Sequence, residues 1–582
     1  MNLPKVCPLR VQNLMKWGTS LMLQQQVVPG ASITCWYSRV HVLGWKLMSM
    51  LVVDLFAGAG GLGEGFAKAG FENVLSCEAE ETFTKTLKLR HFARYTSQES
   101  FHEDYYRFLM GKLELDVLYE RHPEAASKAS ASSLRYTLGN EKRNKSFHKR
   151  LRQQVGEQEF GLLGGPPCQA YSLAGRSRRL GSKGTKREQS KRAAEFYKDE
   201  KHALYLNYLE TVAFHRPAFF LMENVKGLLS AKKANGAEQG SVFKDILEGL
   251  GKPISTLRTL GVEKDDRGHN LVPVEYKLMP LAPSDDLFDY ELSSPRPSDF
   301  VINAKDFGVP QSRERVFILG VREDVYIDRL ELKTFSSPTV WETIGHLPKL
   351  RSGLSKSEDS FESWLRNVET NSRTFFAGSK LSSALTKVLA DLKALNEPLM
   401  RSSHEVISNL PANKSSELES FLTDKELARW TQHETRGHLE SDIIRYLYCA
   451  LAAKELGRSP TLKDWDGNLE KLRPRHNNIK LDANSLYTNA HLDRFKVQVA
   501  HRPSSTITSH ISKDGHYFIH PDPMQARSLT VREAARLQTF PDNYFFCGPR
   551  TEQYIQVGNA VPPFLAYRIA TAIKVSMSKH RG

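Results

Sequence analysis

A glycine-rich turn that follows an apolar run constrains the fold of this chain more than any other stretch. Residues 51–56 read Leu-Val-Val-Asp-Leu-Phe, which predicts a buried strand, and residues 57–63 read Ala-Gly-Ala-Gly-Gly-Leu-Gly. A helix is expected from about 62 to 69. A strand, a glycine turn and a helix in this order bring backbone N–H groups close to a bound cofactor. The turn therefore predicts an α/β domain with a nucleotide-type cofactor, although glycines alone do not identify that cofactor.

An acidic residue ends the second predicted strand, which covers residues 73–77. This residue is Glu78, and it follows the glycine turn by about twenty positions. In α/β folds of this type, a carboxylate at that place holds a pair of ribose hydroxyls. The alternative is a solvated surface carboxylate, but the preceding glycine turn favours a ligand contact.

A single cysteine stands at the end of the next apolar run, residues 160–163. The loop that follows reads Gly164-Gly165-Pro166-Pro167-Cys168-Gln169, so its backbone is stiff and its thiol has a defined direction. Ligands of open α/β sheets bind beyond the carboxyl ends of the strands. A thiol is a nucleophile only as thiolate, and its ordinary pKa is about 8.5. Cys168 is thus a candidate nucleophile, with an inert buried cysteine as the alternative.

Two further apolar strands carry charged residues at their ends. A helix is expected from about 203 to 214, and the strand 218–222 after it leads into Glu223. A carboxylate directly after so apolar a run is desolvated, which raises its pKa. Arg313 and Arg315 precede the strand 316–321 at alternate positions, and we expect both to point to one side. Strands and helices that alternate in this way predict a doubly wound sheet.

The charge of the chain indicates a polyanionic partner. The net charge is +15, and residues 176–192 hold eight basic residues and one acidic residue directly after the cysteine loop. This composition favours nucleic acid over a membrane surface, and a mobile basic loop could close on phosphates. The six cysteines form no C-x-x-C pair, so no metal site is predicted and a reducing, intracellular compartment fits best. No apolar run is long enough to span a bilayer.

The remaining segments suggest a divided catalytic domain. Residues 1–49 carry no motif, and Met48 or Met50 could be the natural start. We expect a catalytic domain at 50–325 with an insertion near 95–155, and a second domain at 326–500. Residues 501–582 would complete the catalytic domain: Thr530 and Glu533 predict a capping box, and a tight turn at 556–563 precedes a helix at about 564–575.

Taken in order, six blocks of this chain resemble those of the DNA (cytosine-5)-methyltransferase family. They are D-L-F-A-G-A-G-G at 54–61, G-P-P-C-Q at 165–169, E-N-V at 223–225, Q-S-R-E-R at 311–315, L-T-V-R-E-A-A-R-L-Q at 529–538 and G-N-A-V-P-P at 558–563. The resemblance covers about 50–325 and 500–575. It implies a Rossmann-like sheet that binds S-adenosylmethionine, with a smaller target-recognition domain, and double-stranded DNA as the partner.

The resemblance also assigns roles to single residues. It implies that Cys168 adds to carbon 6 of a flipped cytosine and that Glu223 acts at ring N3. It also implies that Arg315, with Arg313 close by, holds the exocyclic oxygen and the nearby backbone. The residues it implies around the cofactor are Phe56, Gly58, Ala59, Gly60, Gly61, Glu78, Pro167, Asn559, Ala560 and Val561. The family's acidic residue after the third strand cannot be identified, so the adenine contact is unassigned.

Two alternatives stay open at this point. A cytosine-5 methyltransferase acting on tRNA shares the catalytic blocks, although the long region at 326–500 and the basic loop favour DNA. A non-catalytic DNA-binding paralogue would have no need of Cys168, Glu223 and Arg315 together. From the family's usual context we expect a monomer in a prokaryotic cytoplasm, associated with the nucleoid, in a restriction–modification or defence system with a possible cognate endonuclease. No residue pattern in the chain indicates which DNA sequence is recognised.

Overall fold

The computed structural model describes the larger part of the chain. The described residues are 50–95, 99–137, 141–167, 200–231, 238–281, 295–328, 330, 332–403, 416–473 and 492–578. Cys168, the basic segment 176–192 and residues 1–49 lie outside them. Among the helices that the structure describes, none combines the length and the apolar character that a membrane span requires.

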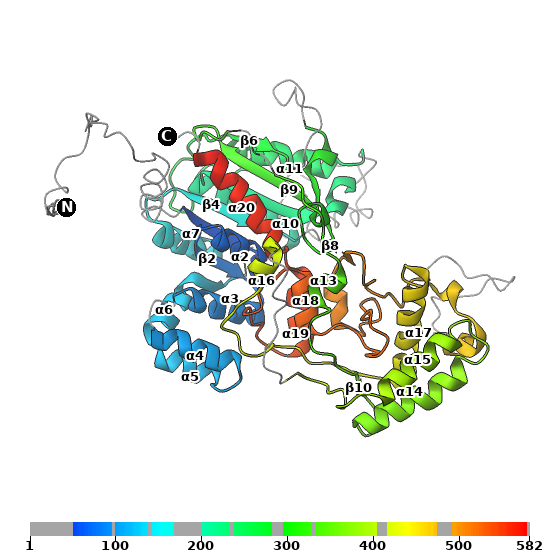
Figure 1. Ribbon diagram of the computed structural model, residues 1–582. Coiled ribbons are helices and arrows are strands. Elements are labelled where there is room, and N and C mark those ends of the chain that lie inside the picture. Colours follow the sequence, from blue (N-terminus) through cyan, green and yellow to red (C-terminus); the bar gives the residue numbers. More distant parts are fainter. Residues whose placement is uncertain are drawn as a thin grey trace, which may run out of the picture. The chain divides into compact units, whose positions relative to one another are not determined.

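A mixed β-sheet of eight strands forms the centre of the described chain (Figure 1). Its strands are β1 (Leu51–Leu55), β2 (Glu72–Glu78), β3 (Ser133–Arg135), β4 (Phe160–Gly164), β5 (Phe219–Val225), β6 (Tyr276–Met279), β7 (Val301–Asn303) and β9 (Glu314–Arg322). The order is β3-β2-β1-β4-β5-β9-β6, and β7 pairs with β9. The strands β3, β2, β1, β4 and β5 run parallel, whereas β9 runs antiparallel to its neighbours. The carboxyl ends of β1, β2, β4 and β5 therefore meet at one edge, as the alternation of elements predicts.

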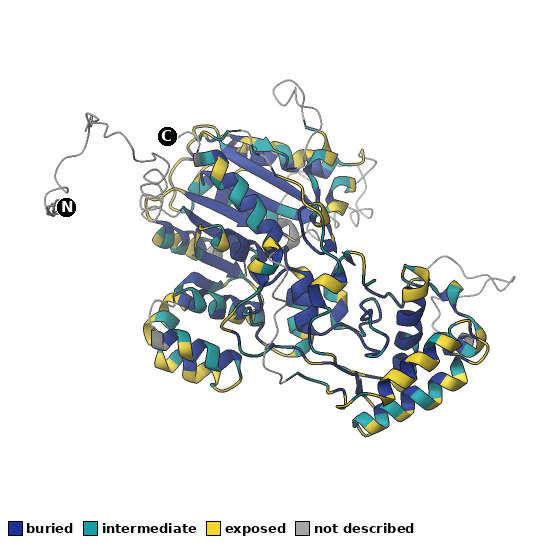
Figure 2. Ribbon diagram, in the orientation of Figure 1, coloured by how far each residue is buried: buried dark blue, intermediate teal, exposed yellow. Residues whose placement is uncertain are grey.

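Helices cover both faces of this sheet, because side chains of a strand alternate between its two faces. On one face, Val53, Leu162 and Phe220 pack with α7 (Glu141–Val155), α10 (Glu200–His215), α11 (Ser241–Gly251) and α12 (Pro253–Thr259). On the other face, Val52 and Leu163 pack with α2 (Gly61–Lys68) and α20 (Pro563–Ser578). Figure 2 shows the central strands buried throughout. The sheet is thus a rigid base for the loops at its edge.

The expected insertion near 95–155 is narrower than predicted. Residues 133–135 form β3, which pairs with β2, and α7 packs against the sheet core. Only α4 (Glu99–Leu109), α5 (Leu115–Arg121) and α6 (Pro123–Ser132) form a separate apolar cluster, together with α3 (Glu81–Arg94). The third strand could not be recognised in the sequence, because its three residues, two of them polar, form no apolar run.

The region at 326–500 is mainly helical and has a core of its own. Its elements include α13 (Val340–Ile344), β10 (Gly353–Leu354), α14 (Phe361–Phe375), α15 (Ser382–Lys393), α16 (Glu417–Leu422), β11 (Gly437–His438) and α17 (Glu440–Leu456). Trp364, Val388 and Ile443 belong to a core that also includes Val497 and Ile519. In contrast, α16 packs on α20, where the Phe421 and Phe564 rings lie 5.2 Å apart. The boundary at residue 500 is therefore not sharp.

The last part of the chain returns to the sheet. A capping box formed by Thr530 and Glu533 starts α18 (Val531–Leu537), as predicted. The next helix, α19 (Arg550–Asn559), was not predicted. It includes residues 556–559 of the tight turn expected at 556–563, so the chain turns only between α19 and α20. The helix α20 then begins at Pro563. The short strand β12 (Ser504–Ser505) pairs with β8 (Gln311–Ser312), which joins this part to the 311–315 block.

Candidate active site

The glycine turn after β1 adopts the backbone that its sequence requires. Gly58 and Gly60 have φ angles of 55° and 80°, and Phe56 also has a positive φ of 55°. Such angles suit glycine and are uncommon for other residues. Asp54 is buried and accepts a hydrogen bond from Gly63 N at 3.1 Å, while burial raises its pKa to about 7. The turn is therefore fixed to the start of α2.

Glu78 lies beside this turn, at the end of the neighbouring strand β2. Its Oε2 accepts a hydrogen bond from Gly58 N at 2.8 Å, and its Oε1 accepts from Ala79 N at 2.8 Å and Glu80 N at 3.1 Å. Burial raises the pKa of Glu78, and these backbone bonds oppose the rise. An ionised carboxylate offers about four acceptor positions, so Glu78 can still accept a hydroxyl donor from a ligand.

The block at 558–563 packs directly on the glycine turn. A Cβ atom on Gly61 would lie 2.1 Å from Val561 O, so only glycine permits this contact. Tyr544 donates its hydroxyl to Ala59 O at 2.5 Å, and Gln538 donates to Ala560 O. Two segments almost five hundred residues apart in the sequence thus form one wall at the edge of the sheet.

Asn224 fixes the cysteine loop to the end of β5. Its Nδ2 donates to Pro166 O at 2.9 Å, and the asparagine side chain is buried. A Cβ atom on Gly165 would lie 3.1 Å from Glu223 Oε2, which is tighter than an ordinary contact. Pro167 is exposed. The described start of the cysteine loop is therefore held against Glu223.

Glu223 and Arg315 form an ion pair between neighbouring strands. Arg315 lies opposite Val225 in the β5–β9 register, two residues from Glu223, and the distance from Arg315 Nε to Glu223 Oε1 is 3.1 Å. Burial raises the pKa of Glu223, and the charges of Arg315 and Arg313 offset only part of this effect. Glu223 can therefore hold a proton closer to neutral pH than an ordinary glutamate.

Arg313 lies in a different environment from Arg315. It separates β8 from β9, and it is buried, with Nη1 donating to Ile507 O at 2.8 Å and both Nη atoms near Gly558 O at 3.4–3.5 Å. Burial lowers the pKa of Arg313 to about 9, and the neighbouring Arg315 charge acts in the same direction. The guanidinium thus binds backbone carbonyl groups of the C-terminal part, whereas Arg315 contacts Glu223.

A cavity of about 430 Å³ opens beside Arg315. It is lined by Val225, Lys226, Gly227, Ser312, Glu314, Arg315 and Thr506. Thr506 donates its hydroxyl to Ser312 O at 2.7 Å, and Lys226 pairs with Glu314 at 2.9 Å. The sequence analysis missed Thr506, because a threonine in a polar segment without periodicity carries no recognisable signal.

Comparison with known families identifies the chain. A family model described as C-5 cytosine-specific DNA methylase matches residues 50–119, 139–252 and 289–575. These ranges include the glycine turn, Glu223, Arg315 and the block at 558–563.

The chain belongs to the C-5 cytosine-specific DNA methylase family. The type II methyltransferase M.Bpa9945I of Bacillus paralicheniformis is 30% identical to it over 553 residues, which cover 91% of this chain and 100% of that protein. M.AgeI of Thalassovita gelatinovora is 24% identical over 564 residues, with 91% and 100% coverage. DNA (cytosine-5)-methyltransferase 1 of Mus musculus is 27% identical over 556 residues, 91% of this chain and 28% of that protein.

The methyltransferase uses S-adenosylmethionine as its methyl donor and DNA as its substrate. The residues at the edge of the sheet fit this cofactor. Gly58 has open space beside its backbone, which permits close approach of a ligand, and Glu78 keeps acceptor capacity for ribose hydroxyls. The two described residues directly after β3, Tyr136 and Thr137, are not carboxylates, and Arg135 at the end of β3 pairs with Glu81 at 2.8 Å.

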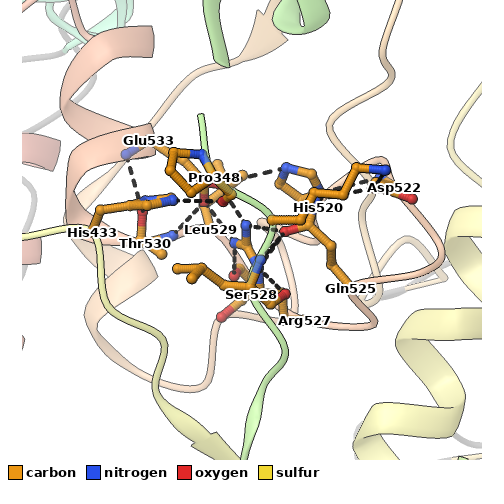
Figure 3. Close-up of polar contacts among 12 residues, drawn as sticks. Pro348, His433, His520, Asp522, Gln525, Arg527, Ser528, Leu529, Thr530 and Glu533 are labelled. Carbon is orange, nitrogen blue, oxygen red and sulfur yellow. Dashed lines mark hydrogen bonds and ion pairs between the residues drawn. The ribbon is translucent and has the colours of Figure 1, made fainter. Parts of the chain in front are cut away.

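A buried polar network in the methyltransferase joins the 529–538 block to the helical region (Figure 3). Arg527 donates to both carboxylate oxygens of Glu533 at 2.6 and 2.7 Å, and also to Leu350 O at 3.1 Å. His433 bridges Thr530 at 3.0 Å and Pro348 O at 2.9 Å. The arginine and glutamate side chains are almost fully buried. The block therefore fixes the segments at 348–350 and 433 relative to the C-terminal part.

Proposed function

We propose that Cys168 is the nucleophile, Glu223 the proton donor to the ring, and Arg315 the oxygen ligand in methylation of a specific DNA sequence. The observation that carries the proposal is the Glu223 carboxyl: it has a raised pKa, lies beside Arg315, and packs against the start of the cysteine loop. A proton donor and a cation next to one cavity suit a neutral base with a ring nitrogen and an exocyclic oxygen.

The protein residues overcome the weak nucleophilicity of carbon 5. The Cys168 thiolate adds to carbon 6 of the cytosine, and the ring electrons move towards carbon 5, which becomes nucleophilic. Protonated Glu223 donates to ring N3 and offsets the charge that builds in the ring. Arg315 donates to the exocyclic oxygen. Because no side chain reaches these atoms inside a duplex, the cytosine must be flipped out.

S-adenosylmethionine supplies the methyl group that carbon 5 takes up. Glu78, Gly58 and the 559–561 backbone would hold the cofactor, with Phe56, Ala59, Gly60, Gly61 and Pro167 along the same edge. After transfer, carbon 5 loses its proton to water, ring N3 returns its proton to Glu223, and the carbon–sulfur bond breaks, which restores the aromatic ring and the Cys168 thiolate. Arg313 would act as a positioning residue through its bonds to Ile507 and Gly558.

A covalent trap tests this proposal. Bisulfite sequencing of DNA from cells that express the protein first gives the target sequence. A duplex with 5-fluorocytosine at that position cannot lose the group at carbon 5, so incubation with S-adenosylmethionine should leave a denaturation-stable protein–DNA adduct. Cys168→Ala should abolish the adduct. Absence of an adduct from the unmodified protein, or methylation of tRNA alone, would overturn the proposal.

The relatives suggest the biological setting. Several are named type II methyltransferases, so we infer that this enzyme modifies DNA in a restriction–modification system, as a monomer, in the cytoplasm with the nucleoid, beside a cognate endonuclease. DNA from expressing cells should then resist one restriction specificity, namely the endonuclease that cuts the sequence found by bisulfite sequencing.

A further inference from the structure

A second cavity adjoins the one beside Arg315. Its volume is about 520 Å³, and it is lined by Ser312, Lys496, Ser505, Thr506, Thr508, His510, Tyr517 and Phe518. Ser312 and Thr506 line both cavities. A ligand in one cavity is therefore separated from a ligand in the other only by a short shared wall.

The floor of the second cavity is rigid. Lys496 N donates to His516 O at 2.8 Å, and Ile519 N donates to Lys496 O at 3.0 Å, so two extended segments pair at this place. Gln498 Nε2 donates to Tyr517 O at 2.8 Å, and Gln498 Oε1 accepts from Ser505 N at 2.9 Å. This framework holds Lys496 and Tyr517 on two paired segments of the chain, and it leaves the polar groups of their side chains unused.

The polar groups that face the cavity are available to a ligand. Among the described residues, none forms a hydrogen bond or an ion pair with the Lys496 ammonium group or the Thr508 hydroxyl. The half-buried Tyr517 ring contacts His510 edge-on, with ring centroids 5.6 Å apart. A free cation beside aromatic rings is the combination that holds the backbone and the bases of single-stranded nucleic acid.

We propose that this cavity binds the nucleotide next to the target cytosine on the same strand, with its base against Tyr517 and its phosphate on Lys496. The inference rests on the proposed function, because it takes the cavity beside Arg315 as the place of the flipped cytosine. Ligand cavities of about 300–1,000 Å³ are usual, so the volume suits one nucleotide. The shared wall of Ser312 and Thr506 places the two cavities in contact, as two consecutive nucleotides require.

Removal of the aromatic ring tests the base contact. Tyr517→Ala should weaken binding to a target duplex about 5- to 150-fold, the loss typical for one base–aromatic stack. On a duplex with an abasic site at one of the two positions next to the target cytosine, the same substitution should have almost no effect. On a duplex with an abasic site three positions away, the full loss should return.

Loss of the cation tests the phosphate contact. Lys496→Met should reduce the slope of log Kd against log salt concentration by about 0.9, the contribution of one phosphate. Lys513→Met is the matched control, since Lys513 is exposed in the same part of the chain, does not line the cavity, and carries the same charge. The control should leave the slope closer to that of the unmodified protein.

The outcomes separate this inference from the proposed function. An equal effect of Tyr517→Ala on all three duplexes would overturn the stacking contact, and so would a loss that disappears only when the abasic site lies on the opposite strand. Equal slopes for Lys496→Met and Lys513→Met would overturn the phosphate contact. In each of these cases the unmodified protein would still form the Cys168 adduct, whereas failure of the proposed function removes that adduct first.

Discussion

Two glutamate–arginine pairs in this methyltransferase consist of the same chemical groups, but the pKa of the glutamate is lowered in one pair and raised in the other. Glu533 accepts from both Nη atoms of Arg527 and from Thr530 N at 2.7 Å. Burial alone would raise the pKa of Glu533, but Arg527 and His520 hold it well below its ordinary value. Glu223 has a single contact with Arg315 at 3.1 Å, and its pKa is raised.

The difference lies in how many donors reach each carboxylate. Several short hydrogen bonds stabilise the charged form of Glu533 more than burial destabilises it. Glu223 is less buried, with 14% of its side chain exposed against 1% for Glu533, and among the described residues Arg315 gives it one longer contact. The Arg527–Glu533 pair therefore joins segments of the fold, whereas the Arg315–Glu223 pair keeps a carboxyl that can take up a proton, as the proposed mechanism requires.

The largest loss of stability is expected when the Arg527–Glu533 pair is broken. Arg527→Met leaves the Glu533 charge buried without its main partner, which should cost about 3–5 kcal/mol in the free energy of unfolding. Arg315→Met is the matched change in the other pair and should cost far less, because Glu223 can take up a proton instead. Urea denaturation of both variants measures this; equal losses would contradict the assignment of different roles.

The second effect concerns catalysis. Glu223→Gln keeps the shape of the side chain but removes the acid, and we expect kcat to fall about 10²- to 10⁴-fold, the usual contribution of a general acid. The free energy of unfolding should not fall, since the amide has no charge to desolvate. Single-turnover methylation and thermal unfolding of the same preparation give both values. A variant with normal kcat would remove Glu223 from the mechanism.

The smallest effect is the pH dependence of stability, which should have opposite signs for the two pairs. The raised pKa of Glu223 means that its contribution is fully present below the unfolded value near 4.3 and is lost as pH rises through the folded value. Glu533 contributes above about 4.3, and this contribution is lost as pH falls towards its lowered folded value.

Variants without these carboxylates show how each group changes the dependence of the unfolding free energy on pH. Relative to the unmodified protein, Glu223→Gln should become more stable as pH rises from about 4 to 8. The deficit of Glu533→Gln should shrink as pH falls below about 4.5. For one titrating group, the difference in unfolding free energy between variant and unmodified protein can change by at most about 1.4 kcal/mol per pH unit. Denaturant curves at several pH values would resolve such a change. Slopes of the same sign would contradict the comparison.

The sequence predicted the sheet and its edge better than the contacts between distant segments. Apolar runs of four to six residues mark β1, β4, β5 and β9, and a capping box marks α18, because these features depend on neighbouring residues. The strand β3 and the helix α19 have no such local pattern. The pairing of β3 depends on β2, which supplies the register that three residues cannot specify.

The site shows the same limit. Glu223 and Arg315 could be placed near one another because each ends or begins an apolar strand. The contact of Asn224 with Pro166 and the burial of Arg313 against Ile507 and Gly558 depend on chain segments about 58 to 245 positions away. No spacing rule in the sequence expresses such contacts, so the backbone partners of Arg313 could not be named from the sequence.

The contact between Gly61 and Val561 also has a consequence for the order of events during synthesis. A ribosome makes the glycine turn early, but the segment that packs on it emerges about five hundred residues later. At about 5–20 residues per second, this delay is roughly half a minute or more. A nascent chain, or one that ends before residue 559, therefore lacks the segment that packs on the glycine turn, and this edge of the sheet is complete only after translation has passed that point.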